Sequence, residues 1–134
     1  MGGVVHIDKD LVAASATLLV LGILAEGESY GYAVLKRVHE LSGGQIEWTD
    51  GMLYPLLHRL ERSGFVTASW GTSDVGRRRK HYAITDTGRK VLAERRSQWD
   101  VVAHALNAVW QTAGLPPSPA LGSGIRPHTD PRWA

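Results

Sequence analysis

Four consecutive cationic residues form the most concentrated chemical feature of the sequence. Arg77, Arg78, Arg79 and Lys80 follow the glycine-bracketed polar stretch GTSDVG. Guanidinium groups can donate paired hydrogen bonds to phosphate oxygens or enter a narrow minor groove, while a lysine acts as a point charge. The alternative is a charged turn that is only solvated and binds nothing. The predicted elements around the four cations favour phosphate binding instead.

A second set of polar side chains shares a helical face just upstream. Four leucines recur at i, i+3, i+4 and i+7 between positions 53 and 60, which predicts an amphipathic helix that begins at Thr49. The face opposite the leucines presents small or hydrogen-bonding groups, which suit contacts with base edges: Thr49, Asp50, Gly51, Tyr54, Pro55 and His58. Tyr54 and Pro55 have two interpretations, because they either contact DNA or shape the start of the helix.

Other chemistry finds little support in the 134 residues. The absence of cysteine excludes disulfides and thiolate metal sites, and the six histidines form no i, i+4 pair. No nucleophile elbow, phosphate loop or dinucleotide fingerprint occurs. We therefore expect no enzyme activity, no metal site and no cofactor.

The charge and hydropathy patterns limit the possible partners. A net charge of +2 argues against a uniformly basic surface, so any basic patch must be local. The longest apolar stretch, Leu11 to Ala25, is shorter than the roughly 20 residues that span a bilayer, and no basic segment precedes it as in a secretory signal. We expect a cytoplasmic, nucleoid-associated protein with no membrane contact.

The remaining patterns predict a fold that is mainly α with a small β-ribbon. Helices are expected from Lys9 to Ala25, from Glu28 or Ser29 to Leu41, and from Thr49 to Gly64. Two short strands, 65–70 and 80–84, should enclose a loop with the cations displayed at its tip, and a long helix should run from 86 to about 112. This order is the layout of a winged helix-turn-helix domain plus a long C-terminal dimerisation helix, in which the second helix of the helix pair enters the major groove.

The same patterns divide the chain into four parts. These are an N-terminal arm (1–8), a winged helix-turn-helix DNA-binding domain (9–85), a C-terminal dimerisation helix (86–113) and a tail (114–134). The tail holds five of the six prolines and no apolar period, so we expect it to be disordered.

The first and last helices carry more apolar surface than one small domain can bury. The first helix is apolar nearly all round, and the last has a stripe at alternating three- and four-residue spacing. We therefore expect a homodimer. The interface residues that we predict are Leu19, Val102, Leu106, Val109 and Trp110.

Three segments resemble, in the right order, the PadR family of bacterial transcriptional regulators: SYGYAVLKRVHE, TDGMLYPLLHRLERSGFV and GRRRKHYAITDTGRKVL. The resemblance runs from about Leu11 to Val109. It implies a homodimeric repressor whose last helix docks on the partner's first helix and whose winged domains bind a pseudo-palindromic operator in double-stranded DNA. With the wing cations, the DNA-binding residues become Ser29, Tyr32, Lys36, Thr49, Gly51, Tyr54, Pro55, His58, Arg77, Arg78, Arg79 and Lys80.

The short length resembles the small PadR subgroup, which includes multidrug-responsive repressors. In these proteins flat hydrophobic compounds lie between two tryptophans, one from each last helix, and Trp99 matches that position. The resemblance implies a ligand site at the dimer interface formed by Leu11, Ala14, Leu18, Arg95, Trp99 and Ala103. Arg95 departs from the expected apolar wall and would favour a polar or anionic ligand or fill part of the pore. Trp99 could instead be plain dimer core.

Two functions are therefore weighed. The first is a sequence-specific DNA-binding transcriptional regulator, a repressor released from its operator by a small, flat hydrophobic or aromatic ligand. The alternative is a winged-helix protein-interaction or small-molecule-binding module that does not read DNA, because a fold does not by itself define a function.

Overall fold

The computed structural model describes residues 6–72 and 76–117, in which four helices accompany a small antiparallel sheet. In chain order the elements are α1 (Lys9–Glu26), β1 (Ser29–Tyr30), α2 (Gly31–Leu41), α3 (Asp50–Arg62), β2 (Val66–Thr72), β3 (Arg78–Ile84) and α4 (Asp86–Thr112). The strands lie in the order β1-β3-β2. The predicted fold class is thereby confirmed.

Local capping explains where the two outermost helices begin. Asp8 precedes α1, and its carboxylate accepts a hydrogen bond from the Asp10 amide at 2.9 Å. Thr85 precedes α4, where its hydroxyl accepts from the Gly88 amide at 3.0 Å and donates to the Gly64 carbonyl at 2.7 Å. Thr85 thus fixes the start of α4 to the turn that follows α3.

The core lies among α1, α2, α3 and the inner part of the sheet. The leucines of α3 that define its period are all buried, as predicted, and they pack with Val34 and Val38 of α2 and with Val20, Leu21 and Leu24 of α1. Val66 and Tyr82 close this core from the sheet. Burial of one face of α3 leaves its other face directed to solvent.

Two features of the sheet differ from the sequence-based prediction. Ser29 does not open α2; with Tyr30 it forms β1, which pairs with Tyr82 and His81 of β3. A strand of two residues has no alternation that a sequence could reveal. The hairpin strands are also longer than predicted, because their pairing continues out to Thr72 and Arg78 through polar residues.

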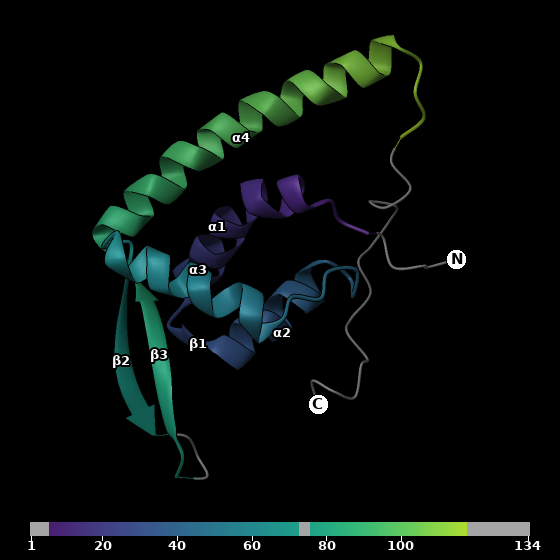
Figure 1. The fold of residues 1–134 in the computed structure, drawn as a ribbon. Helices are drawn as coiled ribbons and strands as arrows, with labels where there is room; N and C mark the ends of the chain where they lie inside the picture. Colours follow the sequence, from purple (N-terminus) through teal and green to yellow (C-terminus); the bar gives the residue numbers. More distant parts are fainter. Residues whose placement is uncertain (1–5, 73–75, 118–134) are drawn as a thin grey trace.

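Helix α4 follows the predicted boundary and packs along α1, but little of its surface is buried. Of its residues, all of which the structure describes, only Gly88 is buried, while Val91 and Leu92 are half-buried against the core. Figure 1 shows α4 passing over α1, with its later half extending beyond the other elements.

Some predicted features fall outside the described residues. Most of the arm (1–8), positions 73–75 of the wing loop and most of the tail (114–134) belong to this group. Among the described helices, none is long and apolar enough to cross a membrane.

Candidate nucleic-acid interface and apolar pocket

Helix α3 presents an exposed surface opposite its buried leucines. Thr49 takes the predicted N-cap position, but its side chain makes no capping hydrogen bond. Gly51, Tyr54, Pro55 and His58 are all exposed, so each predicted α3 residue is accessible to solvent. The helix runs through Pro55 as one continuous segment.

The cationic run lies partly in a strand, which corrects its predicted place at the tip of the loop. Arg78, Arg79 and Lys80 belong to β3, and Arg77 lies immediately before it. Residues in a strand point alternately to opposite faces, so Arg78 and Lys80 share one face and Arg79 takes the other. The prediction placed the charges at the tip because a polar sequence gives no signal for a paired strand.

Each of the three strand cations lies over an aromatic ring. The Arg78 guanidinium carbon is 4.9 Å from the centroid of the Trp70 ring, and that of Arg79 is 4.0 Å from the centroid of Tyr30. The Lys80 ammonium lies 5.7 Å from the centroid of Tyr82. These distances fall within the range of cation–π attraction.

Lys80 and Tyr82 also interact with groups from α3. The Lys80 ammonium lies 3.7 Å from the nearer Glu61 carboxylate oxygen. Burial raises the pKa of the Tyr82 phenol above its usual value, and the neighbouring Tyr54 and Glu61 raise it further. Tyr82 is therefore a neutral ring at physiological pH.

A surface hollow of about 480 Å³ separates α3 from the wing, the β2–β3 hairpin. It is lined by Tyr30, Gly31, Tyr32, Tyr54, His58, Trp70, Arg78, Arg79, Lys80 and Tyr82. Gly31 allows the close approach of Tyr54, because a Cβ there would collide with the Tyr54 ring and hydroxyl. The hollow brings together predicted residues from α2, α3 and the wing.

Of the predicted residues in β1 and α2, one lines this hollow and two do not. Tyr32 lines it from the first turn of α2. Ser29 in β1 and Lys36 on α2 are half-buried and lie outside its lining. Sequence reasoning missed Tyr30 and Trp70; their spacing from the arginines becomes meaningful only once the strand register is known.

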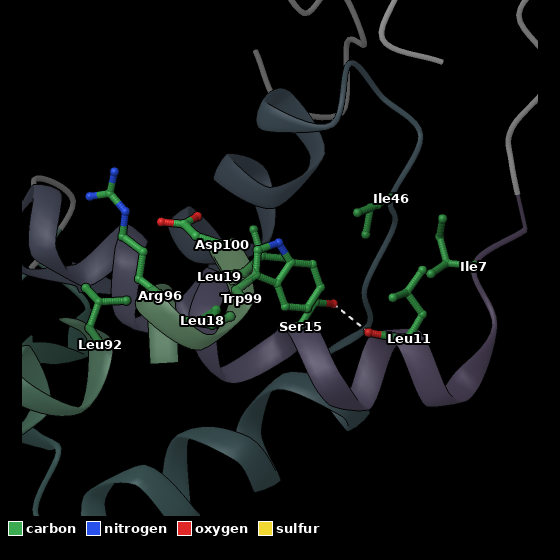
Figure 2. Close-up of a pocket in the computed structure, with 10 residues that line it drawn as sticks. All are labelled: Ile7, Leu11, Ser15, Leu18, Leu19, Ile46, Leu92, Arg96, Trp99 and Asp100. Atoms are coloured by element: carbon green, nitrogen blue, oxygen red, sulfur yellow. Dashed lines mark hydrogen bonds between the residues drawn. The ribbon is translucent and has the colours of Figure 1, made fainter. Parts of the chain in front are cut away.

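A second cavity, of about 560 Å³, lies between α1 and α4. It is lined by Ile7, Leu11, Ser15, Leu18, Leu19, Ile46, Leu92, Arg96, Trp99 and Asp100. Figure 2 shows the Trp99 indole extending from α4 toward α1, near Ser15, whose hydroxyl donates to the Leu11 carbonyl at 2.7 Å.

The lining overlaps with the predicted ligand site in part. Leu11, Leu18 and Trp99 line the cavity, whereas Ala14, Arg95 and Ala103 do not. The neighbouring Arg96 lines the cavity in place of Arg95, together with Asp100, because one residue turns the helix by about 100°. Leu19, predicted as a dimer contact, lines this cavity as well.

Beyond the cavity, α4 exposes an apolar stripe. Val102, Leu106, Val109 and Trp110 remain 43–55% exposed in the single chain. Contiguous apolar surface of this kind marks an interaction site.

The model of the transcriptional regulator PadR-like family matches residues 20–94. Transcriptional regulator Rv3488 of Mycobacterium tuberculosis is 33% identical over 107 residues, which cover 79% of this chain and 96% of that protein. Transcriptional regulator YqjI of Escherichia coli is 28% identical over 104 residues, or 78% of this chain and 48% of that protein.

The comparison with solved structures also finds PadR-like transcriptional regulators. A PadR-like transcriptional regulator from Bacillus cereus has a TM-score of 0.68 at 26% identity and covers 77% of this chain and 98% of its own. A PadR family regulator from Eggerthella lenta has a TM-score of 0.66 at 33% identity, with 77% and 88% covered.

Proposed function

Because the chain belongs to the PadR-like family of transcriptional regulators, we propose that it is a homodimeric repressor that binds a pseudo-palindromic operator. The observation that carries this proposal is the hollow between α3 and the wing, where exposed polar groups of the helix face the cations of the strand. A helix and a ribbon on either side of such a hollow fit two neighbouring grooves of one duplex.

The exposed face of α3 and the wing have different roles in this proposal. Thr49, Gly51 and His58 on α3 contact base edges in the major groove, where each base pair has a distinct hydrogen-bonding pattern. Arg77, Arg78 and Arg79 contact phosphates and supply affinity that does not depend on sequence.

The dimer in this proposal forms through α4 and α1. The exposed stripe on α4 needs a partner surface, and a second copy supplies one through a two-fold axis. Two copies of α3 related by such an axis suit half-sites separated by one helical turn of DNA, about 10–10.5 base pairs.

We further propose that the α1–α4 cavity binds a flat aromatic ligand that releases the protein from its operator, as in the multidrug-responsive subgroup. Its apolar walls and the Trp99 ring suit such a ligand, and Arg96 and Asp100 add one charge of each sign to the lining. Ile46, which also lines the cavity, lies in the turn that leads into α3. An occupant therefore touches the segment that positions the DNA-reading helix.

DNA binding is tested by fluorescence anisotropy on a duplex from the protein's own upstream region, over a range of salt concentrations. The binding constant K should fall with salt, so log K against log salt has a negative slope. Changing Arg78 and Arg79 to alanine should make this slope less steep, by about 0.9 for each phosphate that the arginines no longer neutralise. The matched control changes Arg89 and Lys90, two exposed cations of α4, and should leave the slope unchanged. A wild-type protein without DNA affinity even at low salt would refute this function and favour the non-DNA-reading module.

Ligand binding is tested by titration with anilinonaphthalene sulfonate, an anionic aromatic dye. We expect dye fluorescence to rise with the wild-type protein but not with Trp99→Ala, while Trp70→Ala binds the dye normally because Trp70 lies outside the cavity. Equal binding by Trp99→Ala would exclude this site.

A further inference from the structure

Trp70 is a large apolar side chain whose position the core does not explain. It is 61% exposed, the largest exposed fraction among the aromatic residues that the structure describes. Its strand neighbours Val66 and Ala68 pack on the core at the base of the same face, but Trp70 lies further out, opposite Lys80. A single exposed aromatic side chain is common on a protein surface, so the argument for a role depends on what lies next to Trp70.

Arg78 is the diagonal neighbour of Trp70 across the hairpin and lies over its ring. Four cross-strand pairs share this face of the hairpin. From the core outward they are Val66–Ile84, Ala68–Tyr82, Trp70–Lys80 and Thr72–Arg78. Arg78 is thus diagonal to Trp70, a separation that long and aromatic side chains bridge, and its guanidinium lies over the indole. Both residues line the hollow that faces α3.

The charge of Arg78 is not balanced within the described part of the chain. Lys80 has the Glu61 carboxylate at 3.7 Å, whereas no carboxylate of a described residue forms an ion pair with Arg78. Arg78 is also exposed, so its freedom to rotate is limited mainly by the ring beneath it. A stacked guanidinium keeps its N–H groups at the edge free to donate to a phosphate.

We propose that Trp70 is a positioning residue of the DNA interface: its indole holds the Arg78 guanidinium at the mouth of the hollow, where it binds a backbone phosphate. This inference rests on the proposed DNA binding and adds a residue and a mechanism to it. The DNA strand that separates the groove read by α3 from the groove beside the wing carries the phosphates closest to this hollow. A pre-ordered arginine loses less side-chain entropy on binding than a mobile one.

The alternative role for Trp70 is stabilisation of the hairpin alone. In that case its removal would lower the thermal midpoint and would weaken DNA binding to the same degree whether or not Arg78 is present. A positioning role predicts a different pattern, because Trp70 then acts only through the arginine.

The experiment is a double-mutant cycle on full-length protein with a labelled duplex of arbitrary sequence at low salt, since phosphate contacts do not depend on sequence. Trp70→Ala should weaken binding about two- to fivefold, in keeping with the strength of an exposed cation–π pair. Arg78→Ala, which removes a charge, should reduce the steepness of the salt dependence by about 0.9, whereas Trp70→Ala, which keeps that charge, should reduce it less. In the Arg78→Ala background, adding Trp70→Ala should have little further effect, and Trp70→Phe should restore part of the affinity.

The matched control is Ser69→Ala, an exposed change on the same strand that points to the opposite face and should leave affinity and slope unchanged. If the wild type and Trp70→Ala bind DNA with equal affinity, the positioning role is refuted while the proposed function still stands. An equal weakening with and without Arg78 would overturn it too, as would a large fall in thermal midpoint. A wild-type protein that does not bind DNA would refute both.

Discussion

The substitution Leu106→Glu should separate the proposed dimer, and its effect can be worked out from exposure. Leu106 keeps 43% of its surface exposed in the single chain. Full burial of a leucine side chain contributes about 1.5–3 kcal/mol, so covering the rest contributes about 0.6–1.3 kcal/mol in each chain. A two-fold interface doubles this to about 1.3–2.6 kcal/mol.

The introduced carboxylate adds a larger penalty. An unpaired ion in an apolar interface costs several kcal/mol, so the total loss should reach at least about 4 kcal/mol. This corresponds to a dimer dissociation constant raised roughly a thousandfold. Sedimentation equilibrium at micromolar concentration should show a dimer for the wild type and a monomer for Leu106→Glu.

The control places the same charge on the other side of the helix. Ala108 is exposed and, at about 100° per residue, lies on the face of α4 away from Leu106, so Ala108→Glu should remain dimeric. A dimeric Leu106→Glu protein, or an equal effect of the two changes, would refute the assignment of the α4 stripe to the interface.

Two further predictions concern stability. Gly88→Ala should lower the free energy of unfolding by about 1–3 kcal/mol in urea, because its Cβ would collide with the Phe65 carbonyl oxygen; Gly22→Ala, with no atom within 4 Å of its Cβ, should not. Glu26 has its pKa lowered below the usual 4.5, chiefly by hydrogen bonding to Arg37, so its ionised form stabilises the fold above that pKa. At pH 7 the wild type should exceed Glu26→Gln in free energy of unfolding by a surface pair's contribution of about 0.2–1 kcal/mol, seen as a slightly higher thermal midpoint, and the difference should disappear as the pH falls through the lowered pKa of Glu26.

Periodic features could be predicted from the sequence, and register-dependent ones could not. The leucines of α3 and the cap at Thr85 specify their elements locally, so the fold class follows from them. The strand β1 and the outer wing depend on pairing between distant segments, which composition does not encode. Tyr30 and Trp70 therefore give no signal in the sequence, although each lies under a wing arginine.

The ligand site shows the same limit on a helix. The resemblance matches Trp99 and the wall position one turn before it, Arg95, but it aligns positions without fixing which side of α4 meets α1. The cavity lining contains Arg96 instead. A step of one residue on a helix changes the direction of a side chain by about 100°, so Arg95 and Arg96 lie on different sides of α4.

The exposed later part of α4, beyond its crossing with α1, gives the proposed regulation a physical basis. This helix is about 40 Å long at 1.5 Å per residue, and it is held to the body near Gly88, Val91 and Leu92. Its direction is then set mainly by what covers the exposed stripe, which in the proposed dimer is the partner chain. The cavity around Trp99 lies where α4 crosses α1, between the anchored start and the exposed stripe. In the proposed regulation, a ligand bound there would tilt α4 near the start of the helix, so that a small change in angle would give a large displacement between the two copies of α3.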